Sequence, residues 1–302
     1  MLFRTGRPSR LHSSADRAAE PAAAGPSPRG PARWFWPARR STGAALVTAL
    51  TVGVIATIAP VSGAAGDIAT GFVRAIRDLG SNSQNGQAFG GTPAVGALFT
   101  MSGGKLKQHF CTASVIDSPH GDLVITAAHC VTGTSGTVVF VPGYDGGTTP
   151  DQVWTVTTVY VDQAWKSSAN PDDDAAILRV SQPGSSVPIE DVTGADKLAT
   201  GAPATRQLVQ VIGYPDSANQ PITCQNWIKE PMTDQLEFDC GSYTDGTSGG
   251  PFLADVDATT GQGRVIGVIG GYEQGGDTPQ VSYSAVLGAN VAALFKTAVA
   301  GG

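Results

Sequence analysis

Residues able to hold a metal are scarce in this chain of 302 residues, which has four cysteines, four histidines and three methionines. A Cys/His zinc cluster or a redox centre would use nearly all of the cysteines and histidines. We therefore expect no metal and no cofactor. Glycine and proline are abundant instead, with 39 and 20 residues. Such a composition disfavours a helical bundle and favours many strands joined by tight turns.

Charged residues make up only 15% of the chain and are unevenly distributed. Residues 1–65 contain eight arginines and two acids, whereas residues 66–302 contain 11 Lys and Arg against 23 Asp and Glu. The body of the protein is thus acidic and has no basic footprint of the kind that binds nucleic acid. We do not expect DNA or RNA as a partner.

No charged residue occurs between Arg40 and Asp67, and the apolar part of this stretch ends in small residues. This pattern is typical of a signal peptide cleaved after Ala64 or Ala65. We therefore expect 1–65 to be a signal peptide with a long basic leader and the mature chain to be secreted, with no membrane contact. An uncleaved anchor is the alternative, because the uncharged stretch is long enough to span a bilayer. The long leader also leaves open a twin-arginine route or a start codon placed too far upstream.

The rest of the chain divides at about residue 90. Residues 66–89 combine a helical pattern with a polar loop, which predicts a propeptide or a linker. In 90–302, short β-rich runs alternate with Gly, Pro, Asn and Asp, which favours a sandwich or a pair of barrels. Only 289–298 reads clearly as helix. The most evident strand runs are 123–126, 137–141, 153–161, 175–180, 208–214, 264–270 and 281–287.

The four cysteines all follow residue 110. In an exported protein an even number of cysteines indicates disulfides, here two, for which three pairings are possible. We favour the neighbouring pairs, Cys111 with Cys130 and Cys224 with Cys240, because each closes a short loop. On the chain-entropy model, a disulfide that closes a loop of this size stabilises the folded state by about 3 kcal/mol.

Three segments contain candidates for chemistry, in the order His, Asp, Ser. His129 ends a hydrophobic run in TAAHC, where a bridged Cys130 would hold the backbone and a fixed imidazole suits a general base. Asp174 ends the acidic run of NPDDDAAIL and adjoins an apolar strand, so it is the acid best placed to orient a buried imidazole. Ser248 lies in DGTSGGPF, where glycines permit a tight turn and the N–H groups of Gly246 and Ser248 can converge on one oxygen.

Each candidate also has a structural interpretation, and two rival chemistries are open to test. Histidines beside a structural cysteine usually pack, acidic runs are usually solvated, and Gly-rich turns are common in this chain. GTSGG also fits the GxSxG pattern of α/β-hydrolases, but those enzymes place the histidine after the serine and no histidine follows His129. A thiol nucleophile is disfavoured because every cysteine has a partner. His109 and His120 have no acid placed to orient them.

Taken together, TAAHC, then DAAIL, then GTSGGP resemble the trypsin-like (chymotrypsin-fold) serine peptidases, in their secreted bacterial form. HFCTASVI before TAAHC extends the match, which covers about two thirds of the chain. The resemblance implies an all-β fold of two six-stranded antiparallel β-barrels with the site between them and a closing C-terminal helix. It implies His129 as general base and acid, Asp174 as its orienting carboxylate and Ser248 as nucleophile.

The same resemblance implies that the N–H groups of Gly246 and Ser248 form an oxyanion hole and that the Cys111–Cys130 disulfide flanks the catalytic histidine. Digestive relatives have an Asp before the catalytic serine that pairs with a newly cut amino terminus, but Thr247 occupies this position. Activation by that ion pair is therefore not expected.

Two further departures concern specificity. Ser242 occurs where trypsin has an acid, so cleavage after Arg or Lys is not supported, and Ile269 stands where glutamate-specific relatives carry a His. The sequence predicts no preference at the cleaved bond, and we interpret Asp245 and Glu273 as surface residues.

These expectations lead to a secreted serine endopeptidase, monomeric, that acts on polypeptides through a Ser-His-Asp triad and an acyl-enzyme. The alternative is a catalytically inactive protein of the same fold that binds a partner, which the altered residues near the pocket suggest. An esterase on this fold is a third, minor hypothesis.

Overall fold

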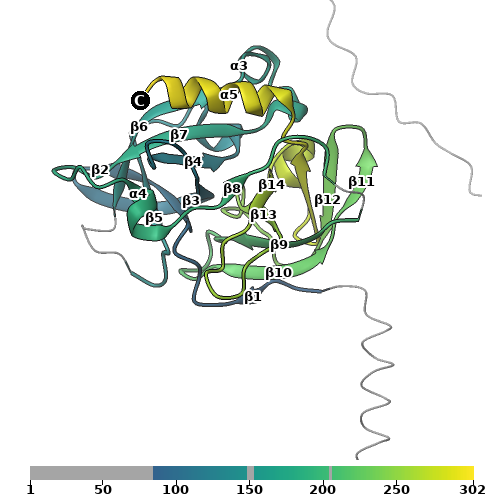
Figure 1. Ribbon diagram of the computed structural model, residues 1–302. Coiled ribbons are helices and arrows are strands. Elements are labelled where there is room, and N and C mark those ends of the chain that lie inside the picture. The colour runs from purple at the N-terminus through teal and green to yellow at the C-terminus, as the bar shows by residue number, and fades with distance from the viewer. Residues whose placement is uncertain (1–83, 148–152, 204–205) are drawn as a thin grey trace, which may run out of the picture. The chain divides into compact units, whose positions relative to one another are not determined.

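The computed structural model describes residues 84–147, 153–203 and 206–302 (Figure 1). The predicted signal peptide and most of the expected propeptide or linker, including its helical pattern, lie outside the described residues. Within the described ranges, no helix has both the length and the apolar character needed to cross a membrane.

The first half of the described chain is a closed barrel of six antiparallel strands. Both faces of its strands are apolar, so that on β4 the side chains of Leu123 and Ile125 enter one core cluster and that of Val124 enters another. Leu98, Phe140 and Leu178 fill the barrel interior and have no solvent exposure. In barrel order the strands are β2 (Val95–Ser102), β3 (Lys105–Ile116), β4 (Leu123–Thr126), β7 (Ala176–Ser181), β6 (Trp154–Val161) and β5 (Thr137–Pro142).

The second half consists of two sheets around a shared core that includes Leu236, Phe238 and Phe252. The six-stranded sheet has the order β1 (Gln87–Ala88), β10 (Ile222–Trp227), β9 (Leu208–Gly213), β13 (Pro251–Ala254), β14 (Arg264–Val268) and β8 (Lys197–Leu198). The three-stranded sheet has the order β11 (Lys229–Met232), β12 (Gln235–Asp239) and β15 (Val281–Ala285).

The predicted all-β fold is confirmed, with one closed barrel, but the second half differs from a single closed six-stranded barrel. Where β14 runs beside β15, the side chain of Ser284 accepts the N–H of Val268 at 2.9 Å, in place of a strand carbonyl. Gly267 of β14 lies so close to Ser284 of β15 that a Cβ added to the glycine would be 2.5 Å from the Ser284 hydroxyl. The Ser284 side chain therefore takes the place of a backbone hydrogen bond between β14 and β15, and the six-stranded and three-stranded sheets stay separate. The β8–β14 pair is parallel, whereas the other strand pairs of the described chain are antiparallel.

The seven predicted strand runs all contain strands of the structure, and the predicted C-terminal helix is α5 (Ala289–Ala300). It follows the second half of the chain but packs beside β6 and β7 of the first barrel (Figure 1). The guanidinium of Arg179 on β7 donates to the carbonyl of Ala298 and pairs with Asp122. The other helices are α2 (Ala128–Val131), α3 (Gln163–Ser168) and α4 (Ile189–Thr193), with 3-10 turns at η2 (Pro171–Asp173) and η3 (Tyr272–Gly275).

The folded body begins before residue 90, where the sequence placed the domain boundary. β1 pairs with β10, and the N–H of Gly86 donates to the carbonyl of Gly241 at 2.8 Å. This strand has two residues and exposed side chains, so it gives almost no hydrophobic signal in the sequence.

Asp196 lies without solvent exposure in the segment that leads from the first barrel to the second half. Its carboxylate accepts the hydroxyl of Ser114 on β3 at 2.6 Å and the N–H of Gly263, just before β14, at 2.7 Å. No Lys or Arg of the described chain pairs with it. Burial raises the pKa of the Asp196 carboxyl to about 6, although the two hydrogen bonds partly oppose the rise.

This shift predicts a pH dependence of stability. Between about pH 4, the ordinary carboxyl pKa, and pH 6, folded Asp196 keeps a proton that the unfolded chain has lost, so stability falls as the pH rises through this window. Between pH 4 and pH 7, the unfolding free energy of the wild type should fall by about 2 to 3 kcal/mol relative to Asp196→Asn. Denaturant titrations at several pH values measure this difference, and parallel profiles would contradict the prediction.

Candidate active site

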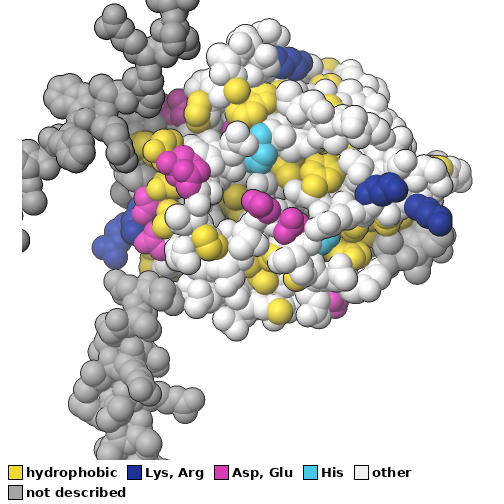
Figure 2. Space-filling model, turned by 180° about the vertical axis from the view of Figure 1, so that it is seen from behind, with side chains coloured by type: hydrophobic (Ala, Val, Ile, Leu, Met, Phe, Trp, Pro, Cys, Tyr) yellow, Lys and Arg dark blue, Asp and Glu magenta, His cyan; other side chains and the backbone are white. Residues whose placement is uncertain are grey.

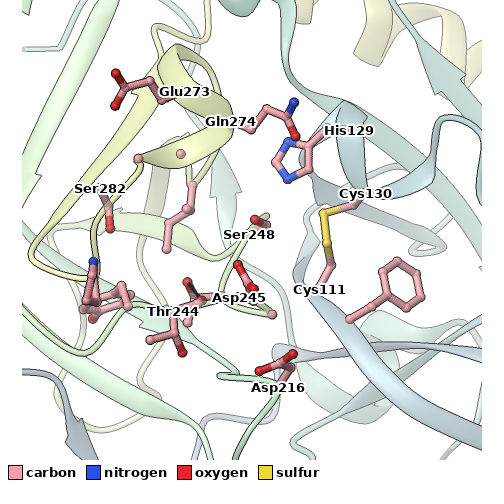
Figure 3. A pocket seen from close by; sticks show the side chains of 18 of the residues that line it. Cys111, His129, Cys130, Asp216, Thr244, Asp245, Ser248, Glu273, Gln274 and Ser282 are labelled. Atoms are coloured by element: carbon pink, nitrogen blue, oxygen red, sulfur yellow. Dashed lines mark hydrogen bonds between the residues drawn. A yellow bond between two sulfur atoms is a disulfide. The ribbon is translucent and has the colours of Figure 1, made fainter.

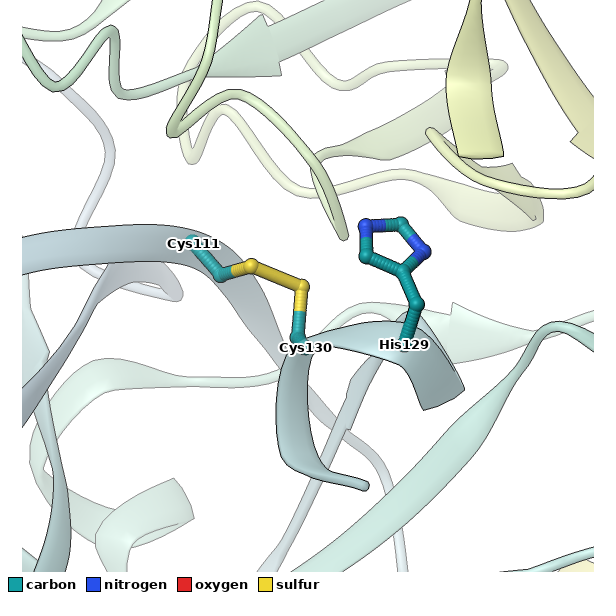
Figure 4. Close-up of side chains that lie close together, drawn as sticks. All are labelled: Cys111, His129 and Cys130. Atoms are coloured by element: carbon teal, nitrogen blue, oxygen red, sulfur yellow. A yellow bond between two sulfur atoms is a disulfide. The ribbon is translucent and has the colours of Figure 1, made fainter. Parts of the chain in front are cut away.

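His129 lies in α2, the short turn that follows β4. The next residue, Cys130, forms a disulfide with Cys111 on β3, beside the imidazole (Figure 4). The side chain of His129 is 15% exposed, and its Nδ1 lies 2.7 Å from Oδ2 of Asp174. The backbone N–H of His129 donates to the other carboxylate oxygen at 2.9 Å. One carboxylate thus fixes both the main chain and the ring of this histidine.

Asp174 lies between the 3-10 turn η2 and strand β7, and it has no solvent exposure. Besides its two bonds to His129, it accepts the N–H of Gly271 at 2.9 Å. A carboxylate that accepts from Nδ1 selects the tautomer in which Nε2 is unprotonated. Nε2 has no hydrogen-bond partner among the described residues, so the ring presents a free acceptor.

The other two acids of the run, Asp172 and Asp173, lie in the turn η2 and make bonds to distant parts of the chain. Asp172 accepts the side-chain amide of Gln235 on β12 at 2.6 Å, and Asp173 accepts that of Asn290 on α5 at 2.6 Å. These contacts join the turn that precedes Asp174 to the second half and to the C-terminal helix.

The loop that carries Ser248 depends on glycines for close packing. Gly246 has a φ of +90°, and a Cβ there would lie 2.5 Å from the backbone nitrogen of Asp216. Gly249 has a φ of +80°, and a Cβ there would lie 2.1 Å from the hydroxyl of Thr126. Side chains at these two positions would therefore meet both strain and collision. The loop can approach the first barrel because both residues are glycine.

Thr112 of β3 makes two hydrogen bonds to this loop and a third to Tyr214. Its N–H donates to the carbonyl of Ser248 at 2.7 Å, and its hydroxyl donates to the carbonyl of Gly246 at 3.0 Å. The same hydroxyl accepts the N–H of Tyr214 at 2.9 Å. Thr112 follows Cys111, so the strand that anchors the disulfide beside His129 also fixes the serine loop.

The backbone N–H groups of Gly246 and Ser248 have no protein acceptor in the described part of the chain. The neighbouring N–H groups of Thr247, Gly249 and Gly250 do have one, respectively the carbonyls of Thr244, Ile269 and Thr247. Within the described residues, the N–H groups of Gly246 and Ser248 are thus free to donate to a bound oxygen.

A cavity of about 1080 Å³ brings these parts together (Figure 3). His129, Gly246 and Ser248 line it, while Asp174 lies buried behind the histidine. Ser248 is partly exposed, and within the described residues its hydroxyl makes no hydrogen bond. The structure therefore joins His129 to Asp174 directly and places Ser248 on the same cavity without a direct bond to the imidazole.

The structure shows where the residues lie that the sequence analysis related to activation and specificity. The hydroxyl of Thr247 donates to the carbonyl of Thr244 at 2.7 Å, so this turn closes without an ion pair. Asp245 and Glu273, interpreted above as surface residues, are exposed and also line the cavity. Ser242 is exposed and is not among the lining residues.

The other histidines and cysteines of the described residues are placed as follows. His109 is buried and its ring contacts the rings of Phe99 and Tyr144. Its Nε2 lies 2.9 Å from the carbonyl oxygen of Pro215. His120 is exposed in a turn. The second disulfide joins Cys224 to Cys240, so both bridges have the pairing that the sequence favoured.

Cys111, His129 and Cys130 place donor atoms within 4.8 Å of one another, the spacing of a metal site. Both sulfurs belong to the disulfide, however, and thus offer no thiolate to a metal. The cluster reflects the bridge beside His129 (Figure 4).

Sequence reasoning missed three residues of the site, which are Thr112, Gly271 and Ser282. Thr112 occurs within HFCTASVI, but a threonine in a strand gives no sign that it bonds a loop more than a hundred residues away. Gly271 contributes only its N–H. Ser282 is a buried serine of β15 that lines the cavity. Its alternation with apolar residues resembles that of any half-buried strand.

Comparisons with known proteins identify the family and the fold. The family model described as trypsin-like peptidase domain matches residues 111–268, just over half of the chain. A search of curated proteins gives no significant match.

Several solved structures share the fold. The protease Anisep from Arthrobacter nicotinovorans is 23% identical, with a TM-score of 0.60 over 71% of this chain and 99% of that one. The thermostable serine protease AL20 from an extremophilic microorganism is 22% identical, with a TM-score of 0.59 over 70% and 99% of the two chains. A Glu endopeptidase crystallised with MPD is 15% identical, with a TM-score of 0.57 over 72% and 98%. The chain therefore belongs to the trypsin-like peptidase family and has the chymotrypsin fold.

Proposed function

We propose that the protein is a secreted serine endopeptidase that hydrolyses polypeptides through Ser248, His129 and Asp174. The observation that carries this proposal is the buried Asp174 carboxylate, 2.7 Å from Nδ1 of His129, behind a cavity that Ser248 also lines. The peptidase family and fold support the reaction class. An esterase of the same fold would use the same groups, and comparing amide with ester substrates distinguishes the two.

In the proposed mechanism, Nε2 of His129 takes the proton of the Ser248 hydroxyl as Oγ attacks the peptide carbonyl. Asp174 stabilises the imidazolium that forms, because its carboxylate is buried and already bonded to Nδ1. The C–N bond then breaks, and the imidazolium gives its proton to the leaving amine. Water hydrolyses the resulting acyl-enzyme with the same base.

The N–H groups of Gly246 and Ser248 would hold the negative oxygen of the tetrahedral intermediate. Each donor of such a pair is worth roughly 3 to 4 kcal/mol of transition-state stabilisation in measured cases. The carbonyl of Gly246 accepts the hydroxyl of Thr112 and the carbonyl of Ser248 accepts its N–H, so Thr112 fixes the peptide plane that follows each of the two donor residues. We therefore assign Thr112 a positioning role.

The leader and the two disulfides support export. Bridges between Cys111 and Cys130 and between Cys224 and Cys240 persist in an oxidising compartment. We propose that 1–65 is a signal peptide, that the segment after it is a propeptide or a linker, and that the mature peptidase domain acts outside the cell as a monomer. A catalytically inactive binding protein is not favoured, because such a protein has no need of an oriented His129 or of unpaired N–H groups beside Ser248.

Ser248→Ala removes the proposed nucleophile, so kcat should fall by roughly 10⁴ to 10⁶ with the fold intact. Hydrolysis of casein or of a peptide ester measures the loss, and circular dichroism verifies the fold. Ser102→Ala, an exposed serine at the end of β2, is the matched control and should retain full activity. A fluorophosphonate probe should label the wild type but not the Ser248 variant. Absence of labelling in the folded wild type would favour the inactive binding protein.

Asp174→Asn should lower kcat about 10⁴-fold, because an amide has only one acceptor oxygen, whereas the carboxylate accepts the backbone N–H of His129 on Oδ1 and its Nδ1 on Oδ2. An amide NH₂ group facing Nδ1 would donate to it and select the unproductive tautomer. The matched control is Asp172→Asn, in the same acidic run, whose remaining carbonyl oxygen still accepts from Gln235. Steady-state kinetics on one peptide compare the two variants. Equal losses in both would remove Asp174 from the proposed mechanism.

Thr112→Val deletes the hydroxyl that bonds Gly246 and Tyr214 while keeping the shape of the side chain. Displacement of the serine loop by a fraction of an ångström should lower kcat by about 10- to 100-fold with little change in KM. Thr112→Ser keeps the hydroxyl and should restore most of the rate. A positioning role would be refuted if the Val variant were fully active below its melting temperature, or if the Ser variant gave no rescue.

A further inference from the structure

The side chain of Gln235 joins two segments near the cavity that are far apart in the sequence. Gln235 is the first residue of β12 and is 3% exposed. Its amide nitrogen donates to the carboxylate of Asp172, in the turn η2, at 2.6 Å. Its amide oxygen accepts the backbone N–H of Tyr272, in η3, at 3.0 Å. One buried amide thus uses both its nitrogen and its oxygen to bridge η2 and η3.

The two bridged segments both hold Asp174. The turn η2 ends directly before Asp174, and Gly271, directly before η3, donates its N–H to Oδ2 of Asp174 at 2.9 Å. The N–H groups of Gly271 and Tyr272 are consecutive, and the second of them bonds to Gln235. The amide oxygen of Gln235 also lies against Gly271, where an added Cβ would be 2.5 Å away from it. Gln235 therefore fixes the chain next to the N–H that reaches Asp174.

The backbone of η3 is strained and depends on such contacts. Glu273 and Gln274 have φ angles of +51° and +53°, in the left-handed region that favours glycine. Both residues line the cavity (Figure 3). A segment in this conformation persists only where the surrounding structure holds it. The bond from the N–H of Tyr272 to Gln235 holds η3 at its first residue.

Hydrogen bonds, and not ion pairs, align the two halves of the described chain. Each salt bridge lies within one half, those of His129 and Arg179 in the first and those of Lys229 and Arg264 in the second. Charged side chains are also sparse on the face drawn in Figure 2, where most of the surface belongs to neither charged class. An uncharged bridge such as that of Gln235 is therefore the kind of contact that can set the position of η3 against the first barrel.

We propose that Gln235 is a positioning residue, which keeps the N–H of Gly271 on Asp174 by joining η3 to η2 and so holds Asp174 in place behind His129. This inference rests on the proposed function, in which Asp174 and His129 activate Ser248. Gln235 is not among the described residues that line the cavity. It therefore acts through Asp174 and not through contact with a peptide.

Gln235→Met removes both hydrogen bonds and keeps the length of the side chain. A small displacement of Asp174 should lower kcat about tenfold. Labelling of Ser248 by a small fluorophosphonate should slow by a similar factor, because this reaction needs the base but no peptide along η3. Gln210→Met is the matched control and should leave both rates unchanged, since its amide bonds Thr223 within the six-stranded sheet. An unchanged labelling rate in folded Gln235→Met would overturn the inference.

A reversal of the hydrogen bond tests the bridge itself. Gln235→Glu places a second carboxylate against that of Asp172, and like charges repel, so this variant should lose at least as much activity as Gln235→Met. Adding Asp172→Asn supplies an amide that donates to the new carboxylate, whose other oxygen still accepts the N–H of Tyr272. In this double variant kcat should recover to within about threefold of the wild type. A double variant as slow as Gln235→Glu alone would refute a role for the bridge.

Hydrogen exchange measures the position of Gly271 without turnover. In Ser248→Ala, which cannot digest itself, adding Gln235→Met should speed exchange of the Gly271 N–H about tenfold, the size of one buried hydrogen bond. The amides of β5, in the first barrel, should exchange as before. Equal acceleration at Gly271 and in β5 would indicate a general loss of stability and overturn the inference.

The same measurements separate this inference from the proposed function. Faster exchange at Gly271 alone, in a protein whose wild type neither cleaves peptides nor reacts with a fluorophosphonate, would keep the placement of Asp174 by Gln235 and reject the peptidase mechanism. Hydrolysis and labelling in the wild type, with unchanged exchange and unchanged rates in Gln235→Met, would do the reverse.

Discussion

The hydrogen bonds of Thr112 connect the two halves of this protein at the point where they meet around the cavity. One residue of β3 holds the carbonyls of Gly246 and Ser248, which belong to the second half of the chain. His129 and Asp174 belong to the first half. The distance between His129 and Ser248, the proposed base and nucleophile, is therefore a distance between the two halves of the fold. It is only as well defined as the bonds that cross between them.

The apolar contact between the halves does not fix that distance alone. One core cluster contains Ile125 and Ile177 of the first barrel together with Ile212 and Leu253 of the second half, and such contacts stabilise without direction. Directional bonds cross the same boundary at several places, among them Asp174 to Gly271. Hydrogen bonds in a low-dielectric interior set a unique register, and leaving one unmade is costly. The hydrophobic area holds the halves together, while these polar bonds determine how they are aligned.

The parts that could be predicted from the sequence are those with a local signal. Strand runs such as 208–214 show β-rich composition, and TAAHC and GTSGG combine reactive residues with the neighbours that hold them. The division of the second half into two sheets could not be foreseen, because it depends on Ser284 entering a ladder from another strand. Thr112 and Ser282 were missed for a related reason. Their place in the site depends on segments that are distant in the sequence and that only the folded chain brings near.

Unpaired polar groups are not confined to the cavity. Four buried side-chain atoms of the described chain lack partners, on Thr92, Ser118, Asp122 and Arg179. Asp122 and Arg179 each make other bonds, however, and neither they nor the two hydroxyls line the cavity. Around the cavity, the groups of the described chain without a protein partner include the N–H groups of Gly246 and Ser248, Nε2 of His129 and the hydroxyl of Ser248. These groups line one cavity, and under the proposed function the carbonyl oxygen of a peptide accepts from the two N–H groups while the hydroxyl of Ser248 gives its proton to Nε2.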